Sequence, residues 1–116
     1  MELLEFKPGV FEDYQQSVKN AENVSEDQAR RKMTRNMLLA HKAKKIEGKD
    51  QLYVYGYLWF WVKGNMIMGV KNGMPPEYGW VKDQKRYEEL NKQLGIIDDR
   101  AESKSWFRRM FDKLTA

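Results

Sequence analysis

The residues with the clearest chemical potential are the basic ones between positions 30 and 49. This segment has eight lysines and arginines against one glutamate, whereas residues 1–29 have seven acidic residues against two lysines. Five of the basic residues recur at spacings of four, seven, three and four, so that on a helix they would form one continuous stripe. They are Arg31, Arg35, Lys42, Lys45 and Lys49. Such a stripe predicts contacts with the phosphates of a nucleic acid. A solvated outer face and neutralisation by the acidic N-terminal segment remain open alternatives.

The second set of candidate residues is aromatic and lies in the segment 51–62. If this segment is one strand, its alternation places aliphatic residues on one face and five rings on the other. The rings are Tyr53, Tyr55, Tyr57, Trp59 and Trp61. Exposed rings of this kind stack on nucleic-acid bases. Two alternatives remain, because a helix could cover the rings as a second core layer, or the rings could pair with those of a second copy.

Residues suited to catalysis or metal binding are sparse. The chain has no cysteine, and its one histidine, His41, lies among lysines on a predicted helix, which excludes a zinc site built from histidine and cysteine. No serine or threonine lies in a nucleophile-elbow context, and no glycine-rich phosphate loop is present. Glu47 and Lys49 have the Glu-x-Lys spacing of some nucleases but lie at a predicted helix end, where no strand positions them. We therefore predict a protein that is not an enzyme and needs no cofactor.

Two helices are predicted before the aromatic segment. Apolar residues at spacings of three and four predict a short amphipathic helix over 10–23. Ser25 followed by Gln28 has the spacing of a capping box, which predicts a second helix from Glu26 to Ile46, ending before Gly48. This second helix would carry the basic stripe.

A β-hairpin and two further helices complete the prediction. Lys63-Gly64-Asn65 supplies turn residues, so that residues 66–70 return as the second strand, and Tyr78 to Val81 could add a short edge strand. Asp83 is a candidate N-cap for a third helix closed by Gly95. The last helix, within 103–116, is amphipathic. It either packs on the domain, docks in a partner's groove or lies at a membrane surface.

These elements predict a single α+β domain over residues 1–116, with residues 1–9 free to be flexible. A small antiparallel hairpin or three-stranded sheet would pack against about four helices, in the order α-α-β-β-(β)-α-α. The sequence has no apolar run of the roughly 20 residues that a membrane span needs, and no signal-peptide pattern. We expect a cytoplasmic protein.

The function predicted from these patterns is low-specificity binding of DNA or RNA. The contacts would come from the five basic residues of the stripe and from Lys63, Lys71, Tyr55, Trp59 and Trp61. The alternative is a protein–protein adaptor or inhibitor that binds its partner through the basic helix or the aromatic face. A homodimer formed through the aromatic face also stays open, and we do not expect a membrane partner.

Overall fold

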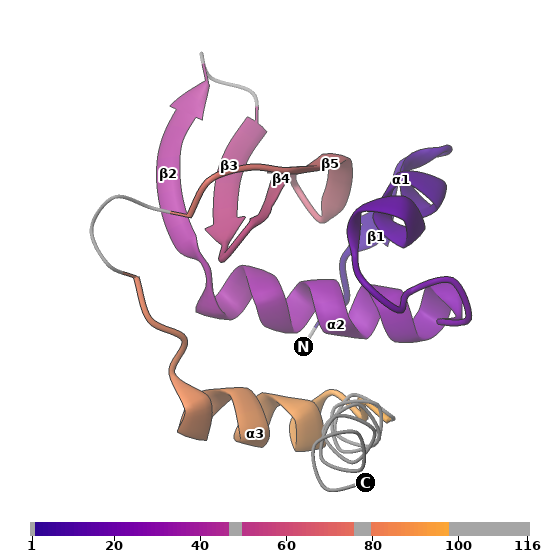
Figure 1. Ribbon diagram of the computed structural model, residues 1–116, viewed down its shortest axis with the longest axis vertical. Helices are drawn as coiled ribbons and strands as arrows, with labels where there is room; N and C mark the ends of the chain where they lie inside the picture. The colour runs from indigo at the N-terminus through magenta and orange to yellow at the C-terminus, as the bar shows by residue number, and fades with distance from the viewer. Residues whose placement is uncertain (1, 47–49, 76–79, 98–116) are drawn as a thin grey trace, which may run out of the picture.

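A computed structural model describes residues 2–46, 50–75 and 80–97, and within them it contains a mixed sheet of five strands and three helices (Figure 1). In chain order the elements are β1 (Glu5–Phe6), α1 (Val10–Ser17), α2 (Glu26–Leu39), β2 (His41–Ile46), β3 (Asp50–Tyr55), β4 (Leu58–Lys63), β5 (Met66–Asn72) and α3 (Gln84–Gln93). The predicted α+β class is confirmed. The predicted order of elements is wrong, because two strands, β1 and β2, were not foreseen.

The sheet is an antiparallel meander with one parallel strand added at its edge. The strand order is β1-β5-β4-β3-β2, and the strands from β2 to β5 pair antiparallel with their neighbours in sequence. Strand β1 pairs parallel with β5 through Glu5 and Phe6. Strand β2 therefore forms the opposite edge of the sheet.

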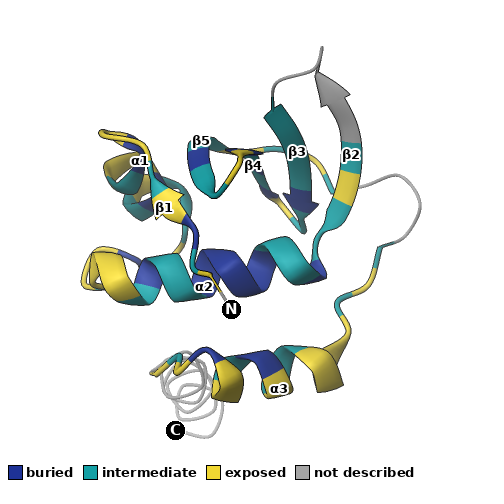
Figure 2. Ribbon diagram, turned by 180° about the vertical axis from the view of Figure 1, so that it is seen from behind, coloured by how far each residue is buried: buried dark blue, intermediate teal, exposed yellow. Residues whose placement is uncertain are grey.

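The described helices all lie on one side of the sheet, which we call its inner face. Helices α1 and α2 cover this face and enclose a core around Tyr14, Met33, Phe60 and Ile67. Helix α3 packs on the far side of α2, where a second cluster forms around Leu39, Leu90 and Leu94. Figure 2 shows that α2, between the two layers, is the most deeply buried helix. The other face of the sheet, the outer face, has no described helix against it (Figure 1).

The aromatic segment is a hairpin of two strands and not the single strand that the sequence predicted. Tyr55 pairs with Leu58, so the loop consists of Gly56 and Tyr57, and Gly56 has the positive φ of 57° that glycine tolerates best. A two-residue loop puts odd-numbered residues of β3 on the same face as even-numbered residues of β4. The predicted face of five aromatic rings is therefore wrong. The predicted hairpin turn is confirmed, because Lys63 pairs with Met66 across Gly64 and Asn65.

The second helix is shorter than predicted. Helix α2 ends at Leu39, because Ala40 is extended with ψ of 157°, and residues 41–46 form β2 against β3. Lysine and alanine are good helix formers, but helix propensity is readily overridden by tertiary context, and pairing with an otherwise open edge of β3 satisfies the backbone groups of this segment as well as a helix would. The basic residues therefore do not form one helical stripe.

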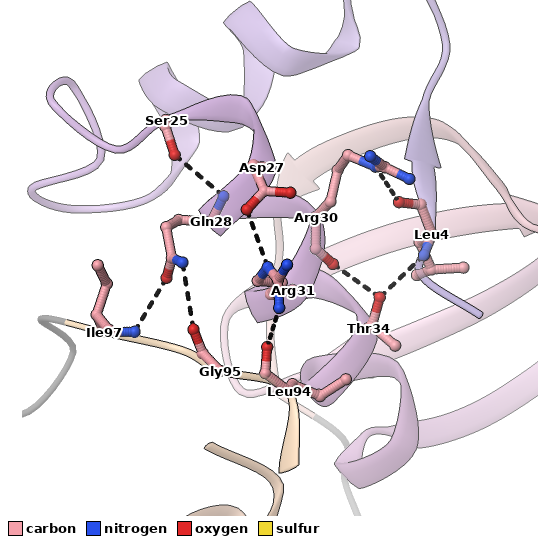
Figure 3. A network of polar contacts seen from close by, with 10 residues as sticks. All are labelled: Leu4, Ser25, Asp27, Gln28, Arg30, Arg31, Thr34, Leu94, Gly95 and Ile97. Atoms are coloured by element: carbon pink, nitrogen blue, oxygen red, sulfur yellow. Dashed lines mark hydrogen bonds and ion pairs between the residues drawn. The ribbon is translucent and has the colours of Figure 1, made fainter. Parts of the chain in front are cut away.

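The predicted N-caps and the predicted end of the third helix are confirmed, whereas α1 ends at Ser17 and not near Asn23. Ser25 accepts a hydrogen bond from the amide of Gln28, and Asp83 accepts one from the amide of Arg86, so both act as N-caps. Gly95 ends α3 with φ of 65°. The side chain of Gln28 does not complete a capping box. It binds the backbone beyond α3 instead (Figure 3).

Two predictions concern residues outside the described part of the chain. The predicted terminal helix within 103–116 lies wholly outside it, and so does Tyr78 of the predicted edge strand. Trp80 and Val81 belong to no strand.

Residues 5–6, in the N-terminal segment for which flexibility was left open, form β1, and Leu4 is buried. No helix in the described part of the chain is both long and apolar enough to cross a membrane.

Candidate nucleic-acid interface

The arginines of α2 hold neighbouring segments in place. Arg31 forms an ion pair with Asp27 (2.9 Å, Nε to Oδ2) and donates from Nη1 to the backbone oxygen of Leu94 at 2.6 Å (Figure 3). Gln28, one turn earlier, donates to the oxygen of Gly95 and accepts from the amide of Ile97. These bonds fix the end of α3 on α2.

Arg35 is buried, with 4% of its surface exposed. Its Nε and Nη2 both donate to Oδ1 of Asn36, and its Nη1 donates to Oδ1 of Asn91 on α3. The guanidinium also lies 4.5 Å from the ring centroid of Tyr87. A phosphate cannot reach donors that are occupied in this way without disrupting the interface, so Arg35 joins α2 to α3.

The predicted lysines are distributed over several elements. Lys42 is exposed on β2, where it pairs in register with Tyr53, and Lys45 lies on the same strand opposite Gln51. Lys49 lies outside the described residues. Lys63 is exposed at the end of β4. Lysines along an edge strand also prevent the edges of two sheets from pairing, so the lysines of β2 have a structural explanation as well.

The structure brings together three of the predicted site residues, Trp59, Trp61 and Lys71, on the outer face. Trp59 pairs across the ladder with Lys71, and Trp61 pairs with Gly69. The Nζ of Lys71 lies 5.2 Å from the ring centroid of Trp59 and 5.5 Å from that of Trp61. Both indoles are half-buried and Lys71 is exposed. We call these three residues the indole–lysine cluster.

The two indoles of the cluster are not equally open. The ring of Trp59 is fixed, because its Nε1 donates to the backbone oxygen of Met74 at 2.7 Å and because a Cβ at Gly73 would lie 2.5 Å from the ring. Trp61 lies over Gly69, which has no side chain to cover the ring. Trp61 is therefore the indole of the cluster that is better placed to contact a ligand.

Tyr55 does not belong to the indole–lysine cluster. It lies on the inner face, because it pairs with Leu58, and its ring meets that of Trp80 edge-on with centroids 5.4 Å apart. Tyr53 is on the same face and stacks on Phe60. Tyr57, in the loop, is 68% exposed.

Sequence reasoning missed Gly69 and Gly73, the two glycines that the indoles contact. The hairpin turn alone could not have found the partner of Trp61, because the register of Lys63 with Met66 would place Trp61 opposite Met68, and a bulge between Trp61 and Val62 shifts its partner to Gly69. Among the side chains that the structure describes, no group of three or more histidines and carboxylates is arranged to hold a metal ion.

Comparison with known proteins places the chain in a family. The YorE family model matches residues 4–93, which span every described element from β1 to the end of α3. The chain belongs to the YorE family. A Bacillus subtilis (strain 168) protein named "SPbeta prophage-derived uncharacterized protein YorE" is 32% identical over 110 residues, covering 84% of this chain and 86% of that protein. No solved structure matches the chain.

Proposed function

We propose that this protein binds single-stranded nucleic acid on the outer face of its sheet and performs no catalysis. The observation that supports this proposal best is the indole–lysine cluster, in which one exposed ammonium lies beside two half-buried indoles. Indoles stack on unpaired bases of any sequence, and lysine binds the phosphates between them. A sheet face that presents rings suits unstacked bases better than a duplex.

The surroundings of the cluster add further positive charge. Lys63 follows Trp61 by two residues on β4 and therefore lies on the same face. The exposed Lys42 of β2 does not add to this charge, because it pairs in register with Tyr53 and so lies on the inner face. Because phosphate contacts carry no sequence information, this binding will have low specificity and will weaken with salt.

The proposal is tested with two matched lysine variants, Lys71→Gln and Lys85→Gln. Both remove one exposed positive charge, but Lys85 lies on α3, on the far side of α2 from the sheet. Fluorescence anisotropy of labelled single-stranded DNA and RNA at about 50 mM salt should show that Lys71→Gln weakens binding several-fold, whereas Lys85→Gln has little effect.

A third variant, Trp61→Leu, removes the ring and tests the stacking contact. We expect weaker binding with a smaller quench of tryptophan fluorescence, because base stacking on an aromatic ring contributes about 1–3 kcal/mol. Equal losses in the two lysine variants would place the site elsewhere. A complete lack of binding to single strands at low salt would overturn the proposal in favour of a protein partner.

A further inference from the structure

A cavity of about 270 Å³ lies on the inner side of the sheet, away from the indole–lysine cluster. It is bounded by the end of α1 and the loop that follows it, by the middle of α2, and by the β3–β4 loop with the end of β5. At this size it can enclose one small ligand and cannot follow a polymer, since sites for drug-sized ligands start at roughly 300 Å³.

The cavity is cationic. Lys32 and Arg35 line it from α2 and Lys19 lines it from the loop after α1, whereas none of the described lining residues is an aspartate or glutamate. Lys32 and Arg35 are 6% and 4% exposed. Burial of two positive charges is costly, and a bound anion would offset part of that cost.

The two buried cations are suited to different parts in binding an anion. Bonds from Nε, Nη1 and Nη2 to Asn36 and Asn91 hold the guanidinium of Arg35 in place, so its main contribution to the cavity is positive charge. An ammonium has three N–H donors, so Lys32 can donate to an anion and still keep a partner within the protein. Lys32 is therefore the residue that would contact the anion directly.

The walls and the entrance of the cavity indicate that the ligand has a planar organic part as well as a charge. Val18, Ala21 and Leu58 make part of the lining apolar, and Tyr57, the most exposed tyrosine in the described part of the chain, stands at the loop that bounds it. An exposed ring at an apolar entrance can stack on a planar group. Asn20 and Asn72 add amide groups that hydrogen-bond ring edges.

The unusual backbone conformation of the loop after α1 also supports a ligand site at this cavity. Asn20, with φ of 65°, is the one residue other than glycine with positive φ in the described part of the chain, and it lines the cavity. Such conformations cost free energy and recur at ligand sites. We propose that this cavity binds one nucleoside phosphate, with the phosphate at Lys32 and the base against Tyr57.

Isothermal titration with adenosine monophosphate, uridine monophosphate, adenosine and inorganic phosphate tests the proposal. We expect the two nucleotides to bind with a Kd on the order of 10–100 μM. Adenosine lacks the anion and phosphate lacks the ring, so both should bind at least tenfold more weakly. No heat from either nucleotide at millimolar concentration, or equal binding of adenosine, would overturn the proposal.

Three variants assign the binding to this cavity. Lys32→Gln should weaken nucleotide binding about tenfold or more, as expected for a lost hydrogen bond to a charged group. Because Lys32 is buried and its variant can fail to fold, the exposed residues Asn72 and Tyr57 provide independent tests. Asn72→Asp places a negative charge beside the cavity without a change of size, and Tyr57→Ala removes the ring. Each should weaken binding several-fold, and unchanged affinity in both would overturn the assignment.

The nucleoside phosphate can be a free nucleotide or the phosphorylated end of a strand. A short oligonucleotide with a 5′-phosphate separates the two sources: binding that Asn72→Asp weakens indicates a strand end, and insensitivity to Asn72→Asp indicates a free nucleotide. This inference does not rest on the function proposed for the outer face. Lys71→Gln should leave mononucleotide binding unchanged, so the two proposals can fail separately.

Discussion

The basic side chains of α2 and of the sheet have the same charge but different partners. On α2, Arg31 and Arg35 donate to backbone and amide oxygens of the α3 segment. On the sheet, the ammonium of Lys71 lies beside two indoles at the surface. A guanidinium holds several acceptors in a fixed geometry, whereas an ammonium on a flexible chain stays solvated and available. The difference teaches that the arginines of α2 serve stability, whereas Lys71 of the sheet is available for binding.

The largest effect that separates the two regions should come from Arg35→Met. The change leaves Oδ1 of both Asn36 and Asn91 without a donor between α2 and α3, and unsatisfied buried polar groups cost about 1–3 kcal/mol each. We expect unfolding free energy to fall by about 2–4 kcal/mol, measured by urea denaturation. Arg35→Lys should rescue little, since lysine cannot bridge both amides. A loss smaller than about 1 kcal/mol would mean that Arg35 is not needed for stability.

A smaller effect is expected from Thr34→Val, which tests the contact of α2 with the N-terminal segment. The hydroxyl of Thr34 accepts from the amide of Leu4 at 2.9 Å and donates to the oxygen of Arg30 at 2.7 Å (Figure 3). Valine has nearly the same shape, so the loss should be about 1–2 kcal/mol, the cost of an unpaired buried amide. Hydrogen exchange of the Leu4 amide should accelerate in Thr34→Val and stay protected in Thr34→Ser, which keeps the hydroxyl. Unchanged exchange in the valine variant would contradict this assignment.

The smallest effect should come from Lys42→Gln, which changes an exposed lysine of the sheet. Stability should not change, because Lys42 is exposed at the edge strand. Because Lys42 pairs in register with Tyr53 and so lies on the inner face, the slope of log K against log salt should match that of the parent, whereas loss of one phosphate contact would lower its magnitude by about 0.7. Anisotropy titrations at several salt concentrations measure this slope. A lower slope in the variant would mean that Lys42 contacts a phosphate and would contradict this placement.

Local signals in the sequence predicted the ends of several elements correctly. The N-caps Ser25 and Asp83, the turn at Gly64 and Asn65, and the helix end at Gly95 all depend on one residue and its immediate neighbours. Such features are readable because their hydrogen bonds and dihedral angles are decided within a few residues.

Features that depend on distant residues were not predictable in the same way. Residues 41–46 have a helix-compatible composition, and only the open edge of β3 makes them a strand. In the aromatic segment, tyrosine and tryptophan occupy the odd-numbered positions on both sides of Gly56. Because the loop has two residues, the odd-numbered residues of β3 face the core, whereas in β4 the even-numbered residues do. The candidate site changed accordingly: Trp59, Trp61 and Lys71 were predicted and do meet, whereas Arg31 and Arg35 proved to be structural.

The bonds on α2 have a consequence for the order in which the chain can fold during synthesis. Arg31 and Gln28 find their α3-side partners 63 to 69 residues later in the sequence. When α2 leaves the ribosome, these partners have not yet been made, so its future interior face stays in water until about residue 97 follows. Contacts this distant are slow to form and delay folding until most of the chain is present. Although α2 lies near the start of the chain, it is among the last elements whose environment is completed.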